Sequence, residues 1–242
     1  NFGDVLAGFY AKLMGLPIHQ LIAAANANHE LADFLETGIY DRNRPFLKTV
    51  APSMDIQISS NLERLLYYKS GEDSSYVAKL MEELATTGRY QVRPDVLAAI
   101  QADFAGGFAA DAQIAASIAA VWKQNDYLLD PHTAVGYHVM QQYRETTGDS
   151  TPNVLLATAS PYKFPRAVAQ ALDLPVTGDD FAVMTQLHQM SGVPIPANLA
   201  RLATLTAQPK HVVAPEEMGQ AIIAAAKEVF NNDQRVRSGN KR

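Results

Sequence analysis

Several short polar segments of this sequence combine residue types that can bind an anion or a cofactor. The first is Asn1-Phe2-Gly3-Asp4, which leads directly into an amphipathic helix predicted from Val5 to Leu13. Backbone N–H groups at a helix N-terminus and the helix dipole together form an anion site, and glycine lets the main chain approach the ligand. The segment therefore predicts half of a phosphate site, although by itself an ordinary capped helix start is the commoner explanation.

Other polar segments follow predicted strands or begin a helix. Asn26-Ala27-Asn28-His29 follows a strand predicted from Ile18 to Ala25, and residues 158–164 follow a strand predicted from Val154 to Ala157. Asp130-Pro131-His132-Thr133 is predicted to begin a helix, because aspartate caps a helix and proline is tolerated at its first position. Ligands of open α/β sheets bind outside the carboxyl ends of the strands. These segments are therefore the candidates for a binding site.

Helices occupy most of the remaining sequence. Apolar residues recur at helical spacing from Val77 to Leu84, from Val96 to Phe104 and from Ile114 to Trp122. We expect three consecutive helices here, the first ending at Gly88 and the next two separated by Gly106-Gly107, with no strand among them. Ser160-Pro161 predicts a further helix start for the same reason as Asp130-Pro131.

The two predicted strands are continuously apolar, which is typical of a parallel sheet covered by helices on both faces. We expect an α/β fold with an open parallel sheet that is incomplete and carries a helical insertion. The predicted divisions are a cofactor-binding α/β part, a mostly helical segment, a continuation of the α/β part with C-terminal helices, and a frayed tail, at residues 1–59, 60–129, 130–230 and 231–242.

Composition excludes several classes of function. The 242 residues carry a net charge of -5, which argues against a nucleic-acid surface. The absence of cysteine excludes disulfides, thiolate metal sites and thiol nucleophiles, and polar residues interrupt every apolar run, so no membrane span is predicted. We expect a cytoplasmic, metal-free protein. Because the sequence begins inside a predicted loop without methionine, we also expect it to be the C-terminal part of a larger protein.

Five motifs occur in the order in which one enzyme family carries them. They are Asn1-Phe2-Gly3-Asp4, Ala25-Asn26-Ala27-Asn28, Pro52-Ser53-Met54-Asp55-Ile56 with Ser59-Ser60-Asn61, Pro131-His132-Thr133-Ala134-Val135, and Ala157-Thr158-Ala159-Ser160-Pro161. Over residues 1 to about 170 the chain resembles threonine synthase, a pyridoxal 5'-phosphate enzyme of the tryptophan synthase β fold type (fold type II). Each motif alone is weak, but five in register are specific.

The resemblance implies an enzyme that converts O-phosphohomoserine and water to threonine and phosphate. In the family the cofactor forms a Schiff base with a lysine upstream of the glycine loop, so that lysine is expected outside this sequence and no catalytic residue is assigned within it. Lys12 is expected to be an exposed helical charge. The isolated chain is accordingly predicted to be inactive, with the N-terminal portion of the same protein as its partner.

The resemblance also assigns cofactor-binding residues. Asn1, Phe2, Gly3 and Asp4 match the loop that holds the cofactor phosphate, chiefly through backbone N–H groups, and Asp4 is expected to cap the following helix. Thr158 matches the hydroxyl residue that faces the pyridine nitrogen; such a neutral partner need not protonate the ring, unlike a carboxylate. On position alone, a threonine bonded to nearby main chain at a strand end is the more common explanation of Thr158, and only the resemblance favours the cofactor role.

Four residues within the motifs have two interpretations each. His132 suits acid–base chemistry, but a packing or capping role is the favoured interpretation. Asn26, Asn28 and Asp55 either contact substrate or order neighbouring loops, and none is predicted to be catalytic. For the whole chain, the alternatives are a threonine synthase-like phospholyase, a serine or threonine dehydratase of the same fold, and a non-catalytic isolated domain.

Overall fold

A computed structural model describes residues 2–206 and 212–239 of the chain, with side chains described as far as residue 230. The chain divides into two units, residues 1–203 and residues 204–242. Within the described residues, no helix combines the length and the apolar character that crossing a membrane requires.

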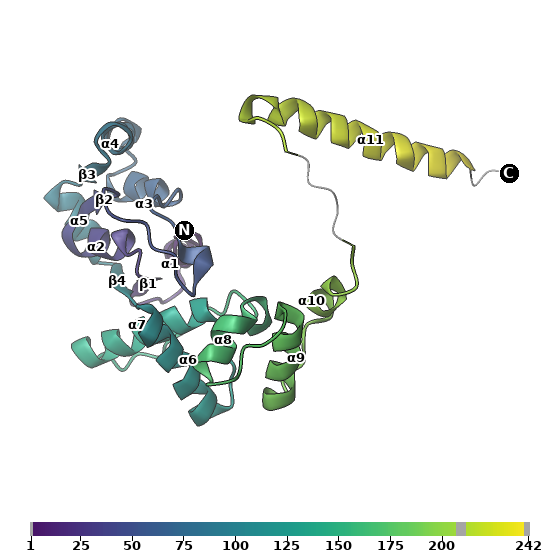
Figure 1. Ribbon diagram of the computed structural model, residues 1–242. Helices are drawn as coiled ribbons and strands as arrows, with labels where there is room; N and C mark the ends of the chain where they lie inside the picture. The colour runs from purple at the N-terminus through teal and green to yellow at the C-terminus, as the bar shows by residue number, and fades with distance from the viewer. Residues whose placement is uncertain (1, 207–211, 240–242) are drawn as a thin grey trace. The chain divides into compact units, whose positions relative to one another are not determined.

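The first unit contains both β-sheets and most of the helices (Figure 1). Its helices are α1 (Gly3–Leu13), α2 (Glu30–Thr37), α3 (Leu62–Lys69), α4 (Ser74–Thr87), α5 (Pro94–Gln101), α6 (Asp111–Asn125), α7 (Pro131–Thr147), α8 (Pro165–Ala171), α9 (Asp180–Ser191) and α10 (Ala197–Leu202), with 3-10 turns at Pro52–Met54 and Pro161–Lys163. Its strands are β1 (Leu21–Ala25), β2 (Ile39–Asp41), β3 (Arg89–Gln91) and β4 (Phe104–Phe108). The second unit consists of a 3-10 turn, Pro215–Glu217, and α11 (Met218–Gly239).

A parallel pair of strands lies at the centre of the first unit. β1 pairs with β4 from Leu21 opposite Phe104 to Ala25 opposite Phe108. A second, antiparallel pair, β2 and β3, lies between α2 and α5 in sequence order. The parallel pairing and the helices around it confirm the predicted α/β fold with a parallel sheet.

Two apolar cores form in the first unit. One surrounds β1 and β4 and takes residues from α1 to α5, including Phe34, Leu65 and Phe104, which are all but inaccessible to solvent. The other lies among α6, α7, α8 and α9 and includes Ile118 and Val168. Residues predicted to form the apolar faces of the helices around 96–100 and 114–121 are buried in these cores, as the helical spacing indicated.

Two glycines let helices pack closely against both faces of β4. A Cβ atom on Gly106 would lie 3.0 Å from Cα of Ala32 in α2, and one on Gly107 would lie 2.7 Å from Cγ1 of Val139 in α7. Because successive strand residues face opposite sides of a sheet, α2 and α7 cover opposite faces. Gly106 and Gly107 do separate α5 from α6, as predicted, but the expectation of no strand among these helices is wrong. The glycines are strand residues at a close backbone approach, and β3 and β4 interrupt the predicted run of helices.

The strand predicted from Val154 to Ala157 is also wrong. These residues are extended but pair with no strand among those the structure describes, and Val154 is 87% exposed. A strand requires a hydrogen-bonded neighbour, and β1 pairs with β4 alone in the described part of the chain. β1 itself begins at Leu21, three residues after the predicted start.

Several predicted helix ends are confirmed. Asp130 caps α7 by accepting hydrogen bonds from the backbone N–H groups of His132 and Thr133, and Ser160 caps the 3-10 turn that follows it. α4 ends at Gly88, whose φ of 79° lies in the left-handed region that glycine adopts without strain. α11 extends through residues 231–239 of the predicted frayed tail, and residues 240–242 lie outside the described residues.

Replacing Gly106 with valine should destabilise the fold. The added side chain meets the main chain of α2, which cannot move aside as a flexible side chain would, so we expect a loss of about 1–3 kcal/mol in the free energy of unfolding. Urea denaturation measures the loss. Gly71→Asn is the control, because no atom lies within 4 Å there and asparagine tolerates the positive φ. Equal stability of Gly106→Val and wild type would contradict the close packing of α2 on β4.

Candidate functional site

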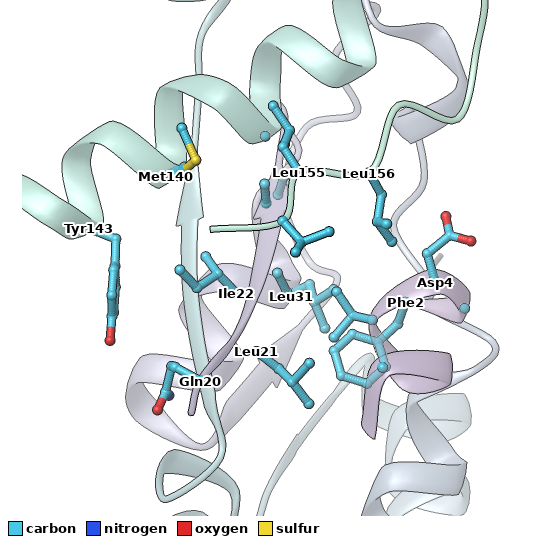
Figure 2. Close-up of a pocket in the computed structure, with 18 of the residues that line it drawn as sticks. Phe2, Asp4, Gln20, Leu21, Ile22, Leu31, Met140, Tyr143, Leu155 and Leu156 are labelled. Carbon is cyan, nitrogen blue, oxygen red and sulfur yellow. The ribbon is translucent and has the colours of Figure 1, made fainter. Parts of the chain in front are cut away.

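A cavity of about 780 Å³ lies in the first unit. Its walls come from the start of α1, the whole of β1, the segment before α3, the middle of α7, and an extended segment around residues 151–158. Figure 2 shows Leu21 and Ile22 of β1 across the cavity from Leu155 and Leu156, with Phe2 and Asp4 nearer one end. Its volume lies within the range that small-molecule sites occupy.

The cavity brings together the predicted cofactor-binding residues that the structure describes. Phe2, Gly3 and Asp4 at the start of α1 and Thr158 at the end of the extended segment all line it. Asn1, the fourth residue of the predicted phosphate loop, lies outside the described residues. Two segments about 150 residues apart in sequence therefore face one cavity.

The start of α1 presents its backbone N–H groups without a capping side chain. Phe2 occupies the N-cap position with a left-handed φ of 61° and makes no side-chain cap hydrogen bond. Its ring is 5% exposed and lies 5.6 Å from the ring of Phe104, centroid to centroid. The buried ring thus fixes the entry of the chain into α1, while the positive end of the helix dipole remains open for an anion.

The prediction that Asp4 caps α1 is wrong. The cap position falls on Phe2, and Asp4 lies inside the first turn with its side chain exposed. A carboxylate in the first turn is still favoured by the helix dipole, so Asp4 stabilises α1 without occupying its N–H groups.

Lys12 does not belong to the site, as expected, but it is not a free surface charge. Its Nζ lies 2.7 Å from Oδ1 of Asp103 and donates to the carbonyl oxygen of His19 at 3.1 Å. Asp103 also pairs with Lys69 of α3. Burial would raise the pKa of Asp103, but the hydrogen bonds from the two lysines outweigh it and hold that pKa below its usual value. Asp103 thereby ties α1 and α3 to the start of β4.

Asn26 and Asp55 order the segment that follows β2. The Asn26 side-chain amide donates to Oγ1 of Thr49 at 2.8 Å, to the carbonyl oxygen of Ala51 at 3.2 Å and to Oδ1 of Asp55 at 2.8 Å. Asp55 in turn accepts from the backbone N–H of Thr49 at 3.1 Å. Asn26 is fully buried. These contacts favour the loop-ordering interpretation of Asn26 and Asp55.

Asn28 continues this network to the rim of the cavity, which it lines. Its side chain donates to the carbonyl oxygen of Leu47 at 2.8 Å and accepts from the backbone N–H of Leu47 at 2.9 Å. The paired contacts hold residue 47 as a neighbouring strand would, although the segment is irregular. Asn28 is therefore a structural residue with one side on the cavity.

His132 links the start of α7 to the Pro52–Met54 turn. Its Nε2 accepts a hydrogen bond from the backbone N–H of Ser53 at 3.0 Å, and its Nδ1 lies 3.0 Å from Oδ1 of Asp130. Both contacts are satisfied by the neutral imidazole with its proton on Nδ1. The ring is 7% exposed and packs against Phe164 at 4.5 Å between centroids.

Asp130 holds this imidazole in place. It accepts from the backbone N–H of His132 at 2.9 Å and from the hydroxyl of Thr133. Burial would raise the pKa of Asp130, but the hydrogen bonds from His132 and Thr133 outweigh it and lower the pKa. Asp130 therefore stays ionised at neutral pH, and the favoured structural role of His132 agrees with its partners.

Glu30, at the start of α2, is a cavity residue that the sequence did not indicate. Its side chain is 2% exposed, and Oε1 makes no hydrogen bond in the described part of the chain. The nearest cation is Arg44, whose Nε lies 3.8 Å from that oxygen and whose Nη2 lies 2.9 Å from Oδ2 of Asp33. Burial raises the pKa of Glu30. Glutamate after a strand is ordinarily exposed, so no pattern in the sequence points to this burial.

Tyr40 lies beside Glu30 on the same wall of the cavity. Its hydroxyl accepts from the backbone N–H of Ser59 at 2.8 Å and donates to the carbonyl oxygen of Gln57 at 3.0 Å. Burial raises the pKa of Tyr40 to about 12, so the phenol stays neutral. Among the residues described, no group of three or more His, Cys, Asp or Glu side chains is placed to hold a metal ion.

Comparison with known proteins finds one family repeatedly. Residues 133–223 match the family model described as threonine synthase, C-terminal. Human threonine synthase-like 1 is 38% identical over 175 residues, which are 72% of this chain and 23% of that protein. Threonine synthase of Saccharomyces cerevisiae is 38% identical over an alignment of 186 residues that covers 71% of this chain and 36% of that protein.

Solved structures of the same family also match. The structure of threonine synthase from Brucella melitensis with bound PLP has a TM-score of 0.71 and 41% identity, covering 85% of this chain and 40% of that chain. The yeast threonine synthase structure has a TM-score of 0.73 and 33% identity, with coverage of 85% and 41%. The chain thus spans between 23% and 41% of the length of these relatives.

Substituting His132 should destabilise the protein more than substituting His138 on the same helix. His132→Phe keeps an aromatic ring against Phe164 but leaves the N–H of Ser53 without its acceptor, and each such buried group costs about 1–3 kcal/mol. Nε2 of His138 is buried with no hydrogen-bond partner among the described residues, so His138→Phe should change the free energy of unfolding by less than about 0.5 kcal/mol. Equal effects of the two substitutions, measured by urea denaturation, would rule out the linking role of His132.

Replacing Glu30 with glutamine should stabilise the protein at neutral pH. Folding raises the pKa of the Glu30 carboxyl above its ordinary value of 4.5. Its contribution to the free energy of unfolding is therefore greatest below pH 4.5 and is lost as the pH rises through the folded pKa. Glu30→Gln removes the buried charge, so we expect a gain of about 1 kcal/mol at pH 7 that shrinks toward pH 4.5. Arg44 keeps Asp33 as its partner.

Chemical denaturation at the two pH values measures this gain. Asp33→Asn is the matched control, since it removes the short ion pair of Arg44 and should not stabilise the protein. A Glu30→Gln protein that is less stable than wild type at pH 7 would show that the carboxylate is needed where it lies.

Proposed function

Because this chain belongs to the threonine synthase family, we propose that it forms part of the cofactor site of an enzyme that converts O-phosphohomoserine and water to threonine and phosphate. The proposal is carried by one observation: the start of α1 and Thr158 line a single cavity. The cofactor proposed is pyridoxal 5'-phosphate, which the Brucella melitensis relative binds.

The residues present fit such a cofactor. The start of α1 offers backbone N–H groups that no cap from Phe2 occupies, and Gly3 has no side chain between its main chain and the cavity. A Cβ atom at Gly3 would lie 3.5 Å from Nδ2 of Asn61, in ordinary van der Waals contact. Phe2, Gly3 and Asp4, with Asn1 before them, would hold the cofactor phosphate.

Thr158 is exposed at the same cavity and would meet the pyridine nitrogen through its hydroxyl. When bound, the cofactor supplies an electron sink for carbanions at the substrate α-carbon. A hydroxyl leaves the protonation of the ring nitrogen free, whereas a carboxylate would hold a proton there. Thr158 would therefore moderate the strength of the sink.

The remaining residues of the site act by position. The buried ring of Phe2 fixes the loop before α1. Asn26, Asn28 and Asp55 hold the segment around residues 47–51, and His132 holds the Pro52–Met54 turn. They hold the loops that border the cavity in place, and none of them is proposed to transfer a proton.

The lysine that links the cofactor is proposed to belong to the rest of the polypeptide. The chain spans 36% of the yeast threonine synthase sequence and 40% of the Brucella melitensis threonine synthase structure. Lys12, the lysine nearest the proposed phosphate loop, is paired with Asp103 and so is held away from this role. The chain is therefore proposed to be inactive alone and active when joined to that remainder.

Activity and mass measurements on the purified chain test this proposal. With pyridoxal phosphate and O-phosphohomoserine we expect no phosphate release, and after borohydride reduction we expect a single unmodified species near the calculated 26.3 kDa. Addition of the remaining portion of the polypeptide should restore phosphate release and place the reduced cofactor on that portion. Turnover by the chain alone, or a cofactor adduct on Lys12, would contradict the assignment.

Analysis of the products separates threonine synthase from the related activities. Threonine formed in equal amount with phosphate identifies the synthase. 2-Oxobutyrate and ammonia formed with phosphate identify a phospholyase, and 2-oxobutyrate formed from threonine itself identifies a dehydratase. Either of the latter two results would replace the proposed reaction but keep the proposed cofactor.

Thr158→Asp should change the cofactor in the assembled enzyme. A carboxylate at the ring nitrogen would hold it protonated, so we expect a shifted absorbance band of the bound cofactor and a rate reduced at least tenfold. Thr158→Ser, which keeps the hydroxyl, is the control and should retain the wild-type band. An unchanged spectrum and rate in Thr158→Asp would show that residue 158 does not face the ring nitrogen.

A further inference from the structure

Two buried polar side chains that line the cavity lack a hydrogen-bond partner. Oε1 of Glu30 and Oγ of Ser59 bond to nothing in the described part of the chain, although the two residues are only 2% and 8% exposed. Both residues line the cavity. Buried polar atoms in folded proteins are nearly always hydrogen-bonded. Two unsatisfied atoms beside one cavity therefore indicate a partner that binds inside it.

The hydroxyl of Tyr40 shows that these two side chains belong to one neighbourhood. It accepts from the backbone N–H of Ser59 at 2.8 Å, and burial, together with the nearby charge of Glu30, raises the pKa of Tyr40 to about 12. The same hydroxyl already donates to a backbone carbonyl oxygen at 3.0 Å, so its hydrogen is not available to either unsatisfied atom. Ser59 comes two residues before Asn61, which lies beside Gly3. The pair is thus at the end of the cavity near the start of α1.

The charges around Glu30 leave its carboxylate without a cation of its own. Nε of Arg44 lies 3.8 Å from Oε1 of Glu30, whereas Nη2 of Arg44 lies 2.9 Å from Oδ2 of Asp33. Two carboxylates therefore share one guanidinium, and Asp33 takes the shorter contact. Burial raises the pKa of Glu30, and the charge of Asp33 adds to that effect. A buried carboxylate is costly unless it is paired, so a further positive charge would be favoured here.

The surroundings favour an organic ammonium over a metal ion. Calcium and magnesium take six or more oxygen ligands, and among the residues described no group of three or more His, Cys, Asp or Glu side chains could hold a metal. A primary ammonium carries one positive charge and three donors, so it can donate to both Glu30 and Ser59. Phe2, Leu31 and Ile56 line the same cavity, the first two labelled in Figure 2. These apolar side chains suit the carbon chain that bears the ammonium.

We propose that Glu30 and Ser59 form a subsite for a primary ammonium group, and that its ligand is the ammonium of the amino-acid substrate as it enters the cavity. The inference rests on the proposed function, whose substrate, O-phosphohomoserine, carries such a group. The ammonium donates to Oε1 of Glu30 and to Oγ of Ser59, and it supplies the positive charge that Arg44 shares with Asp33. Glu30 and Ser59 hold the substrate before it reaches the cofactor, and they transfer no proton.

Calorimetric titration of the assembled polypeptide without cofactor tests the subsite. The probes are O-phosphohomoserine and 4-phosphooxybutanoate, which is the same molecule without the ammonium. We expect O-phosphohomoserine to bind at least tenfold more tightly, because a site built around hydrogen bonds discriminates against an analogue that lacks the donor. Glu30→Gln keeps the shape of the side chain but removes its charge, so it should abolish this preference. Ser59→Ala should reduce the preference without abolishing it.

A matched variant and a third probe complete the experiment. Glu36→Gln is the control, since Glu36 lies on the same helix with its side chain exposed, and it should keep the wild-type preference. Propylammonium tests whether the ammonium alone finds the subsite. We expect it to compete with O-phosphohomoserine in the wild-type protein and in Glu36→Gln, and to lose at least tenfold in affinity in Glu30→Gln.

Three results would overturn the proposal. They are equal affinity of the wild-type protein for the two phosphate probes, equal weakening of both probes by Glu30→Gln, and binding of propylammonium that does not compete with O-phosphohomoserine. The second would show that Glu30 only supports the cavity, because a structural role does not distinguish the ammonium from its absence.

This test is separate from that of the function, because no turnover is measured. A protein that shows the preference but forms 2-oxobutyrate would sink the proposed reaction and leave the subsite standing. A protein that forms threonine without the preference would sink the subsite and leave the reaction standing.

Discussion

The contact on which the rest of the structure depends is the close approach of α2 and α7 to the two faces of β4. Gly106 and Gly107 make it possible, because any side chain there would meet Ala32 or Val139. Helices this close to the sheet place the starts of α2 and α7 near the end of β1. Asn28 lies just before α2 and His132 in the first turn of α7, and both line the cavity. The cavity lies at that region, so its polar walls follow from the packing of an apolar layer.

Polar contacts then fix segments that the apolar cores cannot order. The irregular chain from Arg42 to Ala51 carries little buried apolar surface, and the amides of Asn26 and Asn28 hold it through its main chain. Asp130 and His132 do the same for the Pro52–Met54 turn. These side chains are buried where a charge or an unpaired amide would be costly, and each is satisfied by backbone or by a neighbouring side chain. The motifs of the sequence are thus largely motifs of loop positioning.

Local signals in the sequence predicted what local chemistry decides. Asp130-Pro131 and Gly88 mark helix ends through capping and a left-handed φ, and the predicted α/β class and family follow from continuous apolar strands and ordered motifs. What failed depends on neighbours far away in sequence. Gly106-Gly107 resembles a turn unless α2 and α7 are known to pack on it, Val154–Ala157 becomes a strand only if another strand lies beside it, and Glu30 is buried by tertiary packing alone.

The central claim is that the start of α1 and Thr158 face the two ends of one cofactor. A structure of the assembled protein with pyridoxal phosphate bound measures this most directly. The account predicts the cofactor phosphate within hydrogen-bonding distance of the backbone N–H groups that begin α1, at Gly3 and Asp4, and the ring nitrogen beside Oγ1 of Thr158. A phosphate held elsewhere, or a ring nitrogen facing another side chain, would contradict it.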